Sequence, residues 1–150
     1  MKRVFWIILL SCIVFNACGQ IDNNKTDAVI WDSLEFKMLH SDTLSNSDWN
    51  YLFKNIHAIT DDISEGLGNG LFNHLKQNEK SSRTVLNILN TYSKEKKQEI
   101  VLSLIELMSI DIVLEGYNSY YDFTVDFPVF SNNLAAKDLY YYIIENNSDV

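Results

Sequence analysis

Three histidines are the side chains whose type and spacing first suggest chemistry. His40, His57 and His74 follow one another at equal intervals. A metal site would need the fold to bring them together with a carboxylate such as Asp61 or Asp62. No two of them have the i, i+4 spacing that places two imidazoles on one helix face. We therefore predict no metal site and interpret His57 and His74 as residues at the boundary of a core.

Asp111 is the most informative carboxylate in the chain. It falls inside the apolar arc of a long predicted helix, at the same angle as Ile100 and Leu104. A carboxylate in that position is either buried with partners or marks an open groove. We expect a buried acid that pairs with a neighbouring segment. We prefer this interpretation to an acid–base role, because no second carboxylate or nucleophile stands beside Asp111 in the sequence.

A G-x-G-x-G pattern at Gly66, Gly68 and Gly70 has a superficial likeness to a phosphate-binding loop. The dinucleotide fingerprint requires a preceding strand and a third glycine at wider spacing. This pattern instead follows a predicted helix, so we expect the glycines to permit close helix packing or a bend. No cofactor is predicted.

The C-terminal segment is rich in tyrosine and phenylalanine. Tyrosines presented together make good contact surfaces, because each brings a large area at a low entropy cost. The candidate interaction surface comprises Tyr120, Tyr121, Phe127 and Tyr141. The alternative is that this segment forms a cap that closes the core.

The elements that must position these side chains are helices. Ser93 suits an N-cap and Gly116 a C′ position, so residues 94–115 are predicted to form one long central helix. A helix this apolar needs other helices around most of its circumference. Shorter helices are predicted at 28–40, after a cap at Ser47, after Asp61, after a cap at Ser81 or Ser82, from Ser119 to the residue before Pro128, and at 134–145.

Composition indicates the fold class and limits the partners. A single Pro and five Gly, with little alternation of β-branched residues, argue against a β-sandwich or barrel. We predict a small all-α, single-domain helical bundle or helical-hairpin array. The net charge of −8 excludes nucleic acid as a favoured partner and favours a basic protein, although it also serves solubility.

The first residues have the organisation of a secretory signal. Lys2 and Arg3 precede an apolar run at Val4–Phe15, which is too short to span a bilayer. The sequence FNACG around Cys18 then places a small residue directly before a cysteine. This arrangement resembles the lipobox of bacterial prolipoproteins.

The resemblance implies cleavage before Cys18 and attachment of acyl chains, palmitate among them, to that residue. Two or three chains make membrane attachment effectively permanent. Gly19 implies sorting to the outer membrane, facing the periplasm or the cell surface. The expected organisation is a signal peptide at 1–17, a lipidated and flexible tether at 18–27, and an acidic helical domain at 28–150. Cys12 leaves with the signal, so the fold must stand without a disulfide.

Two classes of function follow. The first is a membrane-anchored, non-catalytic lipoprotein that acts as a protein-interaction module, in a sharper form an immunity-type lipoprotein that neutralises a basic toxin. The second is a small envelope hydrolase that uses Asp111. A deep pocket that gathers Asp111 with a histidine would favour the enzyme, whereas a flat acidic or aromatic face would favour binding. We predict the non-catalytic class, because the sequence has no nucleophile elbow or catalytic triad order.

Overall fold

The computed structural model describes residues 23–40, 43–59 and 61–147. The predicted signal peptide and Cys18 lie outside these residues. The chain has two units, Met1–Asp32 and Ser33–Val150. Of the first unit, the structure describes residues 23–32, which are helical. The packing of helices against one another belongs to the second.

The described residues form helices and no strands, which confirms the all-α prediction. Two short 3-10 helices, η1 and η2, accompany the α-helices. The elements in order are α2 (Asn23–Leu39), α3 (Asn46–Asn55), η1 (Ile56–Ala58), α4 (Asp61–Gln77), α5 (Glu79–Leu89), α6 (Lys94–Leu107), α7 (Ser109–Glu115), α8 (Tyr120–Asp126), η2 (Pro128–Phe130) and α9 (Leu134–Asn146).

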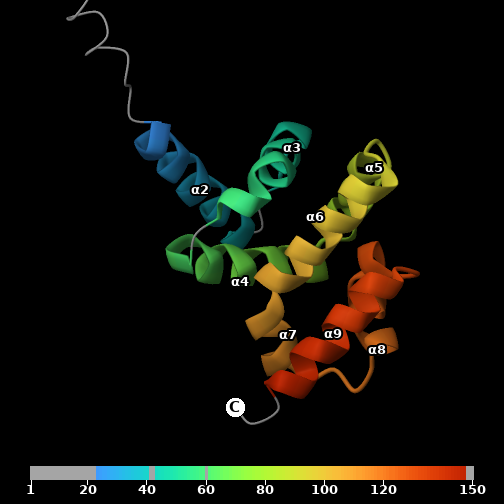
Figure 1. Cartoon of the computed structure of the whole chain (residues 1–150). Coiled ribbons are helices and arrows are strands. Elements are labelled where there is room, and N and C mark those ends of the chain that lie inside the picture. The colour runs from blue at the N-terminus through green and yellow to red at the C-terminus, as the bar shows by residue number, and fades with distance from the viewer. Residues whose placement is uncertain (1–22, 41–42, 60, 148–150) are drawn as a thin grey trace, which may run out of the picture. The chain divides into compact units, whose positions relative to one another are not determined.

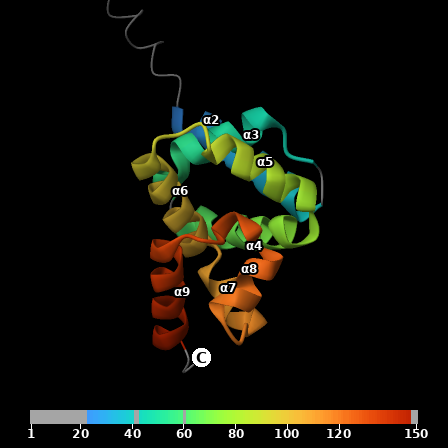
Figure 2. The ribbon, with the colours of Figure 1, turned by 90° about the vertical axis from the view of Figure 1, so that its right-hand side faces the viewer.

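Helix α4 runs through the middle of the second unit. Helices α3 and α5 lie on one side of it, and α7, α8 and α9 lie on the other, as both ribbon views show (Figures 1 and 2). Helix α6 packs against both α4 and α9. The core between these helices is apolar, and its fully buried members include Trp49, Leu52, Phe53, Leu67, Leu71, Leu75, Val85, Leu104 and Ile105.

The predicted central helix is helical over its range but is not continuous. Its two ends agree with the sequence: the Ser93 side chain accepts a hydrogen bond from the Lys96 amide, and Gly116 ends α7 in the left-handed conformation at φ 70°. The chain leaves the helical conformation at Met108, with φ −89° and ψ 6°, so α6 and α7 run in different directions (Figure 1). The single helix expected at 94–115 is therefore two helices.

The three glycines of α4 bring this helix close to its neighbours, as the packing interpretation predicts. A Cβ atom built on Gly70 would lie 3.0 Å from Met38 Cβ on α2, and one on Gly66 would meet the Glu35 carboxylate. A Cβ atom on Gly68 would overlap the backbone carbonyl of Leu107, at the junction of α6 and α7. Helix α4 thus contacts α2 through one face and the α6–α7 junction through another.

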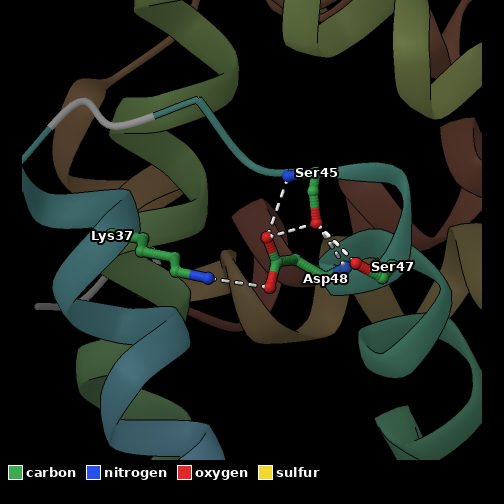
Figure 3. A network of polar contacts seen from close by, with 4 residues as sticks. All are labelled: Lys37, Ser45, Ser47 and Asp48. Atoms are coloured by element: carbon green, nitrogen blue, oxygen red, sulfur yellow. Dashed lines mark hydrogen bonds and ion pairs between the residues drawn. The ribbon is translucent and has the colours of Figure 1, made fainter.

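A polar network fixes the start of α3 against the end of α2 (Figure 3). Asp48 Oδ2 accepts hydrogen bonds from the Ser45 amide at 2.8 Å and from Ser45 Oγ at 2.7 Å, and Lys37 Nζ donates to Asp48 Oδ1 at 2.9 Å. Burial on its own would raise the pKa of Asp48, but the hydrogen bonds from Lys37 and Ser45 outweigh it and lower that pKa.

Two caps differ from the sequence prediction. Ser45 caps α3 in place of Ser47, because its side chain and that of Asp48 form a reciprocal capping box. Asn78 caps α5 by accepting from the Ser81 amide at 3.1 Å. Ser81 and Ser82 cannot serve as caps because both are buried within α5.

Part of the predicted tether is helical. Helix α2 begins at Asn23, so residues 23–27 of the predicted tether belong to a helix.

The aromatic C-terminal segment closes the core. Phe123 lies at its centre, with ring centroids 4.9 Å from Phe127, 5.5 Å from Phe130 and 5.2 Å from Tyr140. The Tyr120 hydroxyl donates to the Phe130 carbonyl at 2.6 Å, and burial raises the pKa of Tyr120 to about 12. This cluster joins α8, η2 and α9 into one layer.

Lys76 links that layer to α4. Its Nζ pairs with Glu115 and lies 3.7 Å from Asp126 Oδ2. The Tyr117 hydroxyl also donates to Asp126 at 2.7 Å. These contacts connect α4, α7 and α8, and they neutralise the Glu115 carboxylate locally.

Candidate functional site

A groove of about 820 Å³ lies along α4 where it meets α6 and α7. Its lining includes Glu35 from α2, Glu65 and Asn69 from α4, Glu106 from α6, and Asp111 from α7. Residues distant in the sequence meet here because the α4 glycines allow α2 and the α6–α7 junction to approach the same helix. The groove is therefore a product of the helix packing.

The electrostatic character of the groove is acidic. Four carboxylates line it, those of Glu35, Glu65, Glu106 and Asp111, and no lysine or arginine is among the lining residues of the described chain. His57 at its edge pairs with Glu99, which also accepts a hydrogen bond from Lys96 at 2.6 Å. A concave surface lined by one sign of charge concentrates the opposite sign.

Asp111 occupies a different environment from the one that the sequence predicts. It is half-buried, so the expectation of a buried carboxylate is wrong. It does pair with a neighbouring segment, since Asn69 Nδ2 donates to Asp111 Oδ1 at 2.6 Å. The cause is the break at Met108: α7 is rotated relative to α6, so the angular position calculated for one straight helix does not hold.

The same break exposes two apolar side chains at the groove. Ile110 is 58% exposed and Leu114 is 74% exposed, and both line the groove beside Asp111. In one continuous helix Leu114 would have belonged to the apolar face. Helix α7 therefore presents a carboxylate and two aliphatic side chains together.

The groove brings Asp111 and a histidine into one concavity, as the enzyme hypothesis requires, but the two side chains do not form a catalytic pair. His57 and Asp111 both line it. His57 pairs with Glu99, however, and Asp111 pairs with Asn69, so the two side chains are engaged separately. Proton transfer between a histidine and a carboxylate requires them to be within hydrogen-bond reach.

The three histidines lie in three different environments. The His40 ring stacks on Phe36 with centroids 4.0 Å apart. His74 is buried, its Nε2 lies 2.8 Å from Ser81 Oγ, and burial lowers its pKa. Within the described residues no group of three or more histidine, cysteine or acidic side chains could hold a metal ion.

The predicted aromatic surface is divided by the fold. Tyr120 and Phe127 are buried members of the core, so their assignment to an interaction surface is wrong. Tyr120 is buried because α8 turns one face onto the core, and Phe127, which follows α8, packs against the rings of Phe72 and Phe123. Tyr121 and Tyr141 are exposed and line a second hollow of about 550 Å³ between α8 and α9.

Sequence reasoning missed the groove as a site. Glu106 lies within the predicted central helix, but Glu35, Glu65 and Asn69 come from separate segments. Their convergence depends on tertiary packing. A usable signal is the glycine spacing on α4, because closely packed helices bring their flanking polar residues together.

Comparisons with protein-family models, with curated proteins and with solved structures gave no match. Among the helices that the structure describes, none combines the length and the apolar character needed to cross a membrane.

Proposed function

We propose that this chain is a membrane-anchored, non-catalytic lipoprotein of the bacterial envelope whose acidic groove binds a positively charged protein partner. The anchor is the acylated Cys18 of the lipobox-like sequence, and Gly19 directs the protein to the outer membrane. The domain on this anchor is helical and acidic, with a net charge of −8 for the whole chain.

The single observation that supports a binding role most strongly is the set of side chains that line the groove. Four carboxylates and two exposed aliphatic side chains line a concavity that contains no lysine or arginine among its described residues. Exposed apolar side chains in a concave surface mark interaction sites. Like charges gathered in this way repel one another, and a cationic partner relieves that repulsion.

The same features suit an immunity-type lipoprotein, which is the sharper form of the proposal. Such a protein neutralises a basic toxin by covering a cationic surface. An acidic groove provides electrostatic steering and therefore rapid association, which is what an inhibitor of a toxin needs.

Photocrosslinking in cells tests the proposal. A photoreactive residue replaces Leu114 in the groove, and in a control chain it replaces Val125, which is 64% exposed on α8 and does not line the groove. We expect a discrete crosslinked protein of basic composition from position 114 only. We also expect its yield to fall when Glu65→Gln and Asp111→Asn are combined.

Crosslinking of equal yield from both positions would contradict the proposal. So would a product whose yield is unchanged by removal of the two charges, because the contact would then not depend on the acidic groove.

A further inference from the structure

We propose that Asp111, oriented by Asn69, anchors a cationic side chain of the partner, and that Ile110 and Leu114 receive an apolar side chain next to it. The occupant of the groove is thus a basic amphipathic segment and not merely a polycation. This inference rests on the proposed function and names the chemistry of the same site.

The first part of the anchor is a pre-positioned carboxylate. Asn69 Nδ2 donates to Asp111 Oδ1 at 2.6 Å, which fixes the carboxylate, while Oδ2 has no hydrogen-bond partner among the described residues. Asp111 is half-buried, whereas Glu65 and Glu106 are exposed. A short, oriented side chain loses less conformational entropy on binding than a free glutamate does.

The second part is aliphatic. Ile110 and Leu114 are four residues apart on α7, and Leu114 is three residues from Asp111, so all three side chains are neighbours on one side of the helix. Both aliphatic side chains are more than half exposed. Covering them would remove apolar surface from water, which a purely charged partner cannot do.

The charge of the groove favours a cationic occupant. The remaining carboxylates of the groove, Glu35, Glu65 and Glu106, surround this anchor without a lysine or arginine among the described lining residues. Glu115, which follows Leu114, is already neutralised by Lys76. A second copy of this acidic chain would place like charges in the groove and is disfavoured.

The probe for the test is a short helical peptide of leucine and arginine, titrated into the full chain in detergent solution. One comparison peptide replaces arginine by citrulline, which has nearly the same shape but no charge. The other replaces leucine by serine and keeps every arginine. Glu79→Gln is the matched protein control, because Glu79 is an exposed carboxylate outside the groove that pairs with Arg83.

We expect Asp111→Asn to weaken binding of the leucine–arginine peptide about tenfold, which corresponds to about 1.4 kcal/mol. Asn69→Ala should weaken it about threefold because the carboxylate is no longer held. Glu79→Gln should change the affinity less than about twofold. The effect of Asn69→Ala should largely disappear in the Asp111→Asn background, since Asn69 acts through Asp111.

The outcomes separate the inference from the proposed function. If only Glu35→Gln, Glu65→Gln and Glu106→Gln weaken binding, the Asp111 anchor is wrong and the acidic groove remains the binding site. Equal binding of the serine–arginine peptide would show that the apolar part is wrong. Failure of every arginine peptide to bind would contradict the proposed function itself.

Discussion

The Cα atom of Gly68 lies directly against the backbone carbonyl of Leu107, where α6 ends and α7 begins. No other residue type fits there, because a Cβ atom would overlap the carbonyl oxygen. This contact joins α4 to the α6–α7 junction, and the direction of α7 after the junction places Asp111, Ile110 and Leu114 at the groove. The α6–α7 side of the groove therefore depends on the close approach at Gly68.

Gly68→Ala is expected to destabilise the protein by about 1–3 kcal/mol, because a backbone carbonyl cannot move aside as a side chain can. Gly66→Ala is the matched control. The new Cβ atom there would meet the flexible end of Glu35, so the gain in helix propensity of up to about 1 kcal/mol should leave stability unchanged or increased. Urea denaturation of the two variants measures the difference. Equal destabilisation would argue against a specific role for Gly68.

Asp48→Ala should destabilise the protein by about 1–2 kcal/mol, since it removes the capping box of α3 and the ion pair with Lys37. Asp122→Ala, which removes a similar contact with Ser119 at the start of α8, should cost less because no lysine pairs with it among the described residues. Thermal denaturation of both variants makes the comparison. A larger loss from Asp122→Ala would show that the Lys37 contact contributes nothing.

The carboxylate of Asp48 also makes the free energy of unfolding depend on pH. Because the pKa of Asp48 is lowered in the folded state, the stabilisation by this carboxylate is present above the ordinary pKa of 3.8. The stabilisation is lost as the pH falls through the pKa of the folded state.

His74 predicts a second loss of stability at a higher pH. Burial lowers its pKa below the ordinary value of 6.5, so the unfolded chain binds a proton more readily than the folded chain does. The free energy of unfolding should therefore fall as pH decreases below about 6.5. His74→Gln should flatten this dependence between about pH 5 and 7, the range over which histidine titrates. His40→Gln, at an exposed histidine, serves as the matched control.

Cys18→Ala should abolish membrane attachment if Cys18 is the acylated residue, because thioether formation requires its sulfur. The measurements are incorporation of a labelled fatty acid and fractionation of cells into soluble and membrane parts. Cys12→Ala serves as the control and should leave both unchanged. Persistent labelling of the Cys18→Ala chain would contradict the lipoprotein assignment.

Local signals in the sequence predict the helical class and several of the helix ends. Ser93, Ser119 and Gly116 stand at helix boundaries, where a side-chain acceptor or a left-handed residue satisfies the terminal backbone groups. Such signals act within a few residues of one another, so they can be read along the chain. The all-helical class follows from them.

The break at Met108 could not be predicted in this way. Leu107, Met108 and Ser109 have ordinary helix propensities, and the break lies where Gly68 of another helix contacts the Leu107 carbonyl. The error in the position of Asp111 follows directly, because an angle computed along a straight helix loses its meaning past a break. Tertiary contact overrides the local pattern at this point of the chain.

The separation of the tyrosines into core and surface has a similar origin. Tyr120 and Tyr121 are adjacent in the sequence, yet the first is buried and the second is 76% exposed. Both belong to a short helix, and only its packing against α9 and η2 decides which side faces inward. Composition identified the aromatic segment without distinguishing these two roles.

The most direct test of the acidic groove as a binding site is to map the contacts of the leucine–arginine peptide by nuclear magnetic resonance. Amide signals of the full chain in detergent micelles are followed as the peptide is added. We expect the largest shifts at Glu65, Asn69, Ile110 and Leu114, and we expect them to diminish as salt is raised. Shifts centred on Tyr121 and Tyr141, or spread evenly over the acidic surface, would contradict the assignment of the groove as the binding site.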